Sequence, residues 1–432
     1  MMSHLQNLIR EHGNGAAAGI ASVCCSNAEV LQAAIAVALE HGGPLLVEST
    51  SNQVDQFGGY TGMRPRDFVA YVRGLARSMD FPAERLILGG DHLGPNTWQH
   101  LPPEQAMAHA RVLIAAYVEA GFEKIHLDCS MACAGDPLPL PDDLVAARSA
   151  DLADVAERAA AGAGLTPPVY VVGTEVPVPG GEASLEGGIQ VTRPQAAAAT
   201  LEAHRRAFAQ RGLEAAWQRV IALVVQPGVD FDHSTVRHYA PAEALELSAF
   251  IEDHPGLVYE AHSTDYQSEQ ALHALVRGHF AILKVGPAAT HALREAWFAL
   301  AAIEDELLPV EQRSHFKAVL ERCMLEQPGY WNKHYPGTPG QQATLRRYAL
   351  SDRSRYYWPA APVQQALATL KANLDAGPLP LPLLSQYLPE QAELVNAGRL
   401  PARAADLARH KVALVLARYA RACRLNGVAA PC

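Results

Sequence analysis

The sequence predicts a (β/α)8 barrel followed by a C-terminal helical extension. Two observations carry this prediction. A short β-branched run followed by a longer helical pattern occurs eight times before residue 309, and most of these runs are almost continuously apolar. Parallel strands that are covered on both faces have this composition. Eight such units fit a closed barrel better than an open doubly wound sheet, which is the alternative.

Each expected strand is followed by polar or glycine residues and then by a helix. The strands are Gly19–Cys24, Pro44–Glu48, Arg85–Gly89, Lys124–Asp128, Val169–Gly173, Ala222–Gln226, Leu257–Ala261 and Ala281–Val285. The expected helices include Ala28–Glu40, Pro65–Met79, Pro103–Ala120, Pro194–Ala209, Pro241–Glu252 and His291–Leu308. Several begin with proline, which suits a first turn because the amide there has no helical partner. We therefore expect the barrel to occupy residues 1–308.

The alternation ends after Leu308, and residues 309–432 have helical patterns with proline-rich interruptions. We expect them to pack on the barrel as an extension. Its stretch Ser351–Trp358 places two arginines beside three aromatic residues. Such a stretch either anchors the extension by packing or covers the barrel mouth and contacts an anionic group.

Composition excludes several classes of partner. The net charge is −10 and no basic block occurs, which argues against nucleic acid as the main partner. No run reaches the roughly 18 apolar residues that a membrane-spanning helix needs. The N-terminus lacks the apolar core of a secretory signal, and seven scattered cysteines, an odd number, suit reduced thiols. We expect a cytoplasmic protein.

Polar residues follow nearly every expected strand, at the end where barrels of this type carry their reacting groups. His126 and Asp128 are two residues apart, as are Glu260 and His262, so each pair shares one face of its strand. The candidate substrate-binding residues are Glu48, Ser49, Asn52, Gln53, Asn96, His126, Asp128, Gln226, Asp265 and Arg353.

Two histidines at strand ends, with carboxylates nearby, predict a divalent cation site. The candidate ligands are His92, His262, Glu175 and Glu260. We expect Zn²⁺, with Mn, Co or Ni as alternatives, although a single histidine at a strand end is often only a hydrogen-bonded structural residue.

Three residues are candidates for catalysis. Asp91 is placed for proton transfer, with a cap on the following loop as its structural alternative. Glu175 is the second candidate. Lys284 either pairs with the carboxylates of the rim or forms a Schiff base with a carbonyl substrate.

At these segments the sequence resembles the non-catalytic subunit family of class II tagatose-1,6-bisphosphate aldolase, the GatZ/KbaZ type. The matching segments are Glu48–Met63 (ESTSNQVDQFGGYTGM), Gly89–Trp98 (GGDHLGPNTW), Lys124–Met131 (KIHLDCSM), Gly173–Gly181 (GTEVPVPGG), Val224–Phe231 (VVQPGVDF), Glu260–Gln267 (EAHSTDYQ) and Leu283–Pro287 (LKVGP). They span nearly the whole predicted barrel.

The resemblance implies a (β/α)8 fold, a role in galactitol or amino-sugar catabolism, and a homo- or hetero-oligomer with a catalytic aldolase subunit. It also implies remote kinship with the catalytic class II aldolases. Asp91 and His92 match their Asp-His pair, in which Asp donates a proton and His binds zinc, and His262 matches a further zinc histidine in kind.

The sequence departs from those catalytic aldolases at two places. Gln226-Pro227-Gly228 stands where they carry another zinc histidine, and Glu175 or Glu260 could take its place. Ser263-Thr264-Asp265-Tyr266 stands where they carry a glycine-rich phosphate loop.

Three functions follow as hypotheses. The chain is the accessory subunit of a tagatose-bisphosphate aldolase, or it is itself a metal-dependent ketose or ketose-phosphate lyase or C4-epimerase of the fructose/tagatose type. The third hypothesis is a sugar-binding scaffold without catalysis, in which Asp91 is dispensable.

Overall fold

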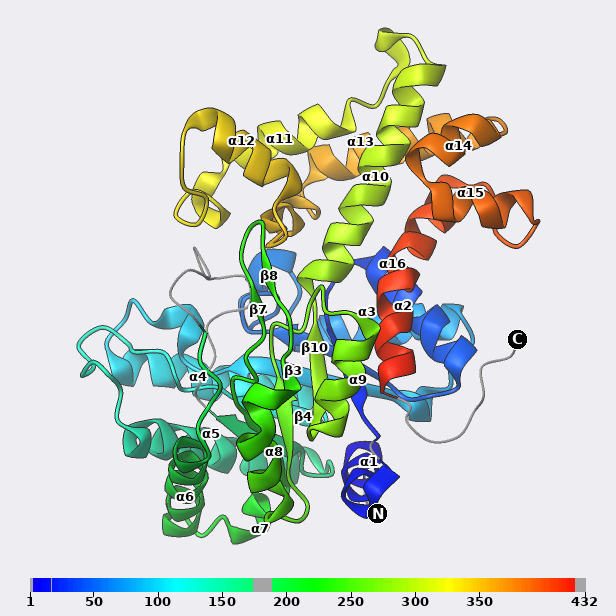
Figure 1. Ribbon diagram of the computed structural model, residues 1–432. Coiled ribbons are helices and arrows are strands. Elements are labelled where there is room, and N and C mark those ends of the chain that lie inside the picture. The colour runs from blue at the N-terminus through cyan, green and yellow to red at the C-terminus, as the bar shows by residue number, and fades with distance from the viewer. Residues whose placement is uncertain (1–2, 17, 174–188, 424–432) are drawn as a thin grey trace.

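The computed structural model describes residues 3–16, 18–173 and 189–423 and confirms the predicted (β/α)8 barrel (Figure 1). Eight parallel strands close in the order β1-β10-β9-β6-β5-β4-β3-β2. They are β1 (Ile20–Cys24), β2 (Leu45–Thr50), β3 (Leu86–Leu93), β4 (Lys124–Leu127), β5 (Val169–Gly173), β6 (Val220–Val224), β9 (Val258–Ala261) and β10 (Phe280–Val285). A two-stranded ribbon, β7 (Asp230–Phe231) and β8 (Val236–Arg237), lies outside the barrel sheet.

Most strand boundaries differ from the prediction by one or two residues, and the differences at the sixth and third strands bear on the site. The sixth strand ends at Val224 instead of Gln226, because the backbone N–H of Gln226 donates to Thr192 Oγ1 and its carbonyl accepts from the Thr192 N–H, both at 2.9 Å. The third strand runs four residues beyond Gly89, to Leu93, and so carries the Asp91-His92 pair within the sheet.

Helices cover the outside of the barrel. They are α2 (Ala28–His41), α3 (Pro65–Ser78), α4 (Pro103–Ala120), α5 (Asp142–Ala163), α6 (Pro194–Gln210), α7 (Glu214–Trp217), α8 (Leu245–Glu252) and α9 (Glu269–Arg277). Proline stands in the first turn of α3, α4 and α6, as the sequence predicts. The largest apolar cluster fills the layer between these helices and the strands.

The lumen of the barrel has its own, smaller apolar cluster at the N-terminal ends of the strands. Leu46, Ile87, Val258 and Ile282 point into it, each from a different strand. Helix α1 (His4–Glu11) closes this end, with Leu5 and Ile9 almost fully buried against the strand residues. The bottom of the barrel is therefore a packed core.

Helix α10 (Pro287–Leu307) extends beyond the C-terminal ends of the strands, where later helices gather around it (Figure 1). They are α11 (Phe316–Glu326), α12 (Pro339–Tyr348), α13 (Ala361–Asp375), α14 (Leu381–Tyr387) and α15 (Pro389–Asn396). The last helix, α16 (Ala404–Ala422), returns to the side of the barrel and packs against α2, α9 and α10. The extension thus covers the barrel mouth and also contributes to the outer layer of helices.

The composition predicts that the chain has no membrane-spanning helix and that its cysteines are reduced. Within the described ranges, every helix falls short of the length and apolarity that crossing a membrane requires. The six cysteines that the structure describes are all free thiols.

Candidate functional site

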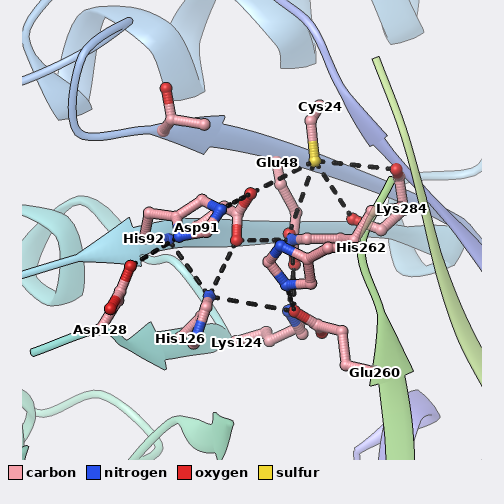
Figure 2. Close-up of polar contacts among 12 residues, drawn as sticks. Cys24, Glu48, Asp91, His92, Lys124, His126, Asp128, Glu260, His262 and Lys284 are labelled. Atoms are coloured by element: carbon pink, nitrogen blue, oxygen red, sulfur yellow. Dashed lines mark hydrogen bonds and ion pairs between the residues drawn. The ribbon is translucent and has the colours of Figure 1, made fainter. Parts of the chain in front are cut away.

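Five buried charged side chains close the lumen at the C-terminal ends of the strands (Figure 2). Lys124 Nζ lies 2.6 Å from Glu48 Oε1 and 2.6 Å from Glu260 Oε2. Lys284 pairs with Glu48, and its Nζ lies 2.8 Å from Asp91 Oδ1 and 3.4 Å from Glu260 Oε1. Each buried charge therefore has an opposite charge beside it, the condition under which a protein interior tolerates ions.

Gly89 makes the space that this charged layer needs. It is the register neighbour of Glu48 on the adjacent strand, and a Cβ at this position would lie 2.5 Å from Glu48 Oε1. Any side chain at Gly89 would push the carboxylate away from both lysines. The glycine is required here for close approach of a neighbouring side chain.

The carboxylates keep both lysines charged. Burial alone would lower the pKa of Lys124, but Glu260 and Glu48 raise it above its usual value. Burial likewise opposes the charge on Lys284, while Asp91 raises the pKa of this lysine well above its ordinary value. A Schiff base needs a neutral amine. The geometry therefore favours the ion-pairing role of Lys284 over the covalent one.

A β-bulge brings two consecutive residues of β3 into the pocket. Side chains normally alternate between the two faces of a strand, which would send Asp91 and His92 in opposite directions. The pairing of β3 with β4 shifts register between Gly90 and Leu93, and His92 has a left-handed φ of 48°. The bulge turns both side chains toward the barrel mouth, and strained backbone of this kind is common at functional sites.

Three histidines surround Asp91, and each gives one ring nitrogen to a carboxylate (Figure 2). The bonds are His92 Nδ1 to Asp128 Oδ2 at 2.7 Å, His126 Nδ1 to Asp91 Oδ1 at 2.9 Å and His262 Nε2 to Glu260 Oε1 at 3.2 Å. In a neutral imidazole, the ring nitrogen that donates to a carboxylate carries the proton, and the other ring nitrogen keeps its lone pair. The carboxylate also fixes the orientation of the ring, as carboxylates do around metal-binding histidines.

The remaining nitrogen of each of these rings is buried and has no hydrogen-bond partner among the described residues: His92 Nε2, His126 Nε2 and His262 Nδ1. The ring centroids lie 4.7 to 5.3 Å apart. Three imidazoles on one tetrahedral Zn²⁺ have centroids about 5 Å apart, given Zn–N bonds of about 2 Å. Ligand atoms of Asp91, His126, Glu260 and His262 also lie within 4.8 Å of one another. Asp91, His126, Glu260 and His262 could therefore hold a divalent cation, whereas His92 stands outside this group.

Asp128 fixes the orientation of the His92 ring through its hydrogen bond to His92 Nδ1. Its Oδ2 also accepts from Asn96 Nδ2 at 2.9 Å, and its Oδ1 accepts from the Ser130 N–H at 3.0 Å. Burial opposes ionisation of Asp128, but the bond from His92 holds its pKa below the usual range. Burial lowers the pKa of His92, while Asp91 and Asp128 raise it to about 9, so a cation at Nε2 would have to displace the proton of this ring. Burial lowers the pKa of His262 to about 4, so its ring is neutral.

Two candidate residues support the loops around the site. Gln226 Oε1 accepts the backbone N–H of Gly228 at 2.8 Å and of Val229 at 3.1 Å, and so holds its own turn. Asp265 Oδ1 accepts the N–H of Gly286 at 3.0 Å and of Ala288 at 2.8 Å, at the start of α10; burial raises the pKa of Asp265 to about 6.

The candidate residues near the end of β2 and in the extension lie apart from the charged layer and its histidines. Ser49 faces outward, where its Oγ lies 3.0 Å from the hydroxyl of Tyr117 in α4. Asn52 is exposed, and Gln53 is buried beside a pocket at the barrel mouth. Arg353 Nη1 donates to the carbonyl of Tyr330 at 2.9 Å within the extension. Glu175, a candidate for both metal binding and catalysis, lies outside the described residues.

The sequence assignment omitted Lys124, Cys24 and Arg355. Lys124 could have been found because it precedes His126 and Asp128 at intervals of two along the predicted strand. Cys24 ends β1, and its Sγ lies 3.6 Å from Asp91 Oδ2. No sequence signal distinguishes Arg355 from Arg353, because only the fold decides which of them faces the barrel mouth.

Several solved structures are similar to this chain. A probable tagatose 6 phosphate kinase from Sinorhizobium meliloti 1021 is 45% identical, with a TM-score of 0.86 over 94% of this chain and 100% of that one. The YdjI aldolase from Escherichia coli K12 is 13% identical, with a TM-score of 0.43 over 87% of this chain and 100% of that one. The fructose-bisphosphate aldolase from Campylobacter jejuni is 13% identical, with a TM-score of 0.43 over 85% and 92%.

Residues 5–424, nearly the whole chain, match one protein family. The barrel with its polar mouth therefore belongs to a protein related to tagatose-bisphosphate aldolase and to carbohydrate metabolism. The chain is a member of the D-tagatose-1,6-bisphosphate aldolase subunit GatZ/KbaZ-like family.

Proposed function

We propose that this chain binds a ketose or ketose phosphate at the barrel mouth and carries out metal-assisted retro-aldol chemistry there. Cleavage of the C3–C4 bond makes it a lyase, and re-addition to the opposite face of the aldehyde makes it a C4-epimerase. One observation carries the proposal: His126 and His262, which are buried, and His92, which is partly buried, each have a carboxylate on one ring nitrogen and, among the described residues, no hydrogen-bond partner on the other, and they surround an ionised aspartate.

His126 and His262 would hold the cation, with His92 as a further candidate ligand, and with Zn²⁺ as the first candidate ion and Mn, Co and Ni as others. Glu260 then orients His262, and Glu175 remains a candidate for a further ligand. When bound, a divalent cation supplies Lewis acidity toward the C2 carbonyl of the sugar.

Asp91 is the group that moves the proton. Burial opposes its charge, but His92 and Lys284 hold its pKa well below the usual range, so it is a carboxylate. As a base it accepts the proton of the C4 hydroxyl when the C3–C4 bond breaks. It returns this proton to the C4 oxygen when the bond re-forms, or to C3 of the enolate when cleavage is completed. Lys284 holds Asp91 in place and offers a fixed positive charge to a developing oxyanion.

Metal exchange combined with substrate screening tests this proposal. The purified chain is stripped with a chelator, reloaded separately with Zn²⁺, Mn²⁺, Co²⁺ or Ni²⁺, and incubated with fructose, tagatose and their phosphates. Elemental analysis is expected to give one ion per chain, and NMR of the products is expected to show triose products or the C4 epimer. Absence of both a bound ion and any conversion would contradict the proposal.

A second candidate function is favoured by the family match. As an accessory subunit, the chain would associate with a catalytic tagatose-bisphosphate aldolase subunit and stabilise or activate it. The test is to assay a catalytic subunit with and without this chain, together with size-exclusion chromatography of the mixture. An unchanged elution volume and unchanged activity would argue against this role.

A further inference from the structure

The loop after β9 joins the candidate cation site to the C-terminal extension. It begins with His262, a candidate ligand, and continues through Ser263, Thr264, Asp265 and Tyr266. Ser263 and Tyr266 have left-handed φ angles of 53° and 64°. Residues other than glycine rarely adopt this region, because their Cβ crowds the backbone there. Contacts from the surrounding structure must therefore hold the loop in this shape.

Three neighbouring parts of the structure hold the far end of this loop. The carboxylate of Asp265 accepts from backbone N–H groups at the start of α10. The hydroxyl of Tyr266 donates to the carbonyl of Leu350 in the extension. Gln267 Nε2 donates to the carbonyl of Arg237 in β8 at 2.9 Å. These bonds fix the residues that are farthest from the candidate ligand, so the residues next to it need an anchor of their own.

Tyr419 of α16 supplies this anchor next to His262. Its hydroxyl donates to the carbonyl of Thr264 at 2.7 Å. The same carbonyl also accepts the N–H of Gln267, at the longer distance of 3.4 Å. Tyr419 is 2% exposed and Thr264 is 0% exposed, so bulk water has little access to this carbonyl. Burial raises the pKa of Tyr419 well above its usual value, and the hydroxyl therefore keeps the proton that it donates.

Thr264 extends this contact to the neighbouring strand of the site. Its hydroxyl lies 3.2 Å from the Tyr419 oxygen and donates to the carbonyl of Lys284 in β10 at 2.5 Å. The side chain of Lys284 pairs with Asp91 in the charged layer. One anchor thus acts on the backbone beside a candidate ligand, His262, and on the backbone of the lysine that holds the candidate base. Displacement of Thr264 would disturb both.

We propose that Tyr419 is a positioning residue of the candidate site: through Thr264, its hydroxyl holds the loop after β9 in the strained shape that places His262 for a cation. The extension thereby controls the barrel site, because α16 packs against α2, α9 and α10 and so brings Tyr419 to this loop. The inference rests on the proposed function for the role of His262 as a ligand, and the hold on the loop is measurable without metal.

Tyr419→Phe in the full chain tests the proposal, because it removes the hydroxyl and keeps the buried ring. Competition with a chromogenic chelator is expected to show about tenfold weaker Zn²⁺ binding, at the lower end of the effect of losing an outer partner of a metal site. The visible spectrum of the Co²⁺-loaded variant is expected to change, because its bands report the arrangement of the ligands. In metal-free protein, hydrogen exchange measured by mass spectrometry is expected to be faster in peptides that span residues 262–267.

Two further variants separate positioning from general loss of stability. Tyr348→Phe removes a hydroxyl from an exposed tyrosine of α12 in the same extension and is expected to behave as wild type in all three measurements. Thr264→Val, which loses the bond to the Lys284 carbonyl, is expected to weaken Zn²⁺ binding, and Thr264→Ser, which keeps the hydroxyl, is expected to retain most of it. Melting curves check that each variant is folded. Exchange that rises in Tyr419→Phe as much in β5, across the barrel, as in the loop would overturn the proposal.

The positioning role and the proposed function fail in different ways. If wild type binds an ion and Tyr419→Phe binds it with equal affinity and an unchanged Co²⁺ spectrum, the positioning role fails and the proposed function stands. If wild type binds no ion, the proposed function fails, and hydrogen exchange alone decides the hold on the loop. Acceleration confined to the loop in Tyr419→Phe then supports this hold, and equal exchange overturns it.

Discussion

The two ends of the barrel lumen have opposite chemistry, although the same strands build both. On β2, Leu46 faces the apolar end beside α1, and Glu48, two residues later, faces the charged end. On β10 the corresponding pair is Ile282 and Lys284. Alternation of side chains thus selects which residues face the lumen. Position along the strand then decides whether an inward residue contributes to stability or to the candidate site.

Asp91→Asn is expected to have the largest effect at the charged end. The amide has the same shape but accepts no proton, so turnover of the ketose should fall by about 10²- to 10⁴-fold. Steady-state kinetics measures this fall, and a melting curve is expected to show a lower melting temperature as well, because Lys284 loses one of its buried carboxylate partners. Asp154→Asn on α5, where the partly exposed Asp154 pairs with Arg158, is the control. Full activity of Asp91→Asn would support a binding scaffold without catalysis.

Lys124→Met and Ile282→Val compare how much the charged end and the apolar end of the lumen contribute to the free energy of unfolding. Loss of this ammonium leaves Glu48 and Glu260 with less compensation, and breaking a buried pair costs about 3–5 kcal/mol. Ile282→Val, at the apolar end, should cost about 0.5–1.5 kcal/mol. Urea unfolding of both variants gives the comparison. If Lys124→Met is no less stable than Ile282→Val, the charged layer does not depend on this lysine.

Asp128→Asn addresses metal affinity through an orienting residue. Asp128 holds His92 at 2.7 Å, and loss of such a partner weakens metal binding about 10- to 100-fold. Competition with a chromogenic chelator measures the change, with the exposed Asp143→Asn of α5 as control. Unchanged affinity would mean that His92 is not a ligand and would leave His126 and His262 as the histidine candidates.

Ile9→Val is expected to have the smallest effect. Ile9 of α1 is 3% exposed against the apolar end of the lumen, and removal of one buried methylene costs about 0.5–1.5 kcal/mol. Metal content and sugar affinity should stay at wild-type values, as measured by elemental analysis and calorimetry. A change in either would show that the two ends of the lumen are coupled.

Much of the barrel could be predicted from local patterns. Continuous apolar runs such as that of β5 were located to the residue, and α4 was predicted with its observed bounds. Polar residues at strand ends pointed to the mouth as the candidate site, and Asp91, His126 and His262 do meet there. Ser49 was assigned to the same site, but strand alternation turns it toward Tyr117.

The sequence by itself determined the order of strands and helices, and the inward positions that would be apolar or charged, because both follow from periods of two and 3.6 residues along the chain. Tertiary structure alone decided which nitrogen of each histidine remains free, that a bulge turns Asp91 and His92 the same way, and that Arg355 faces the mouth. These features depend on contacts between residues far apart in the chain. Such contacts leave no local pattern in the sequence.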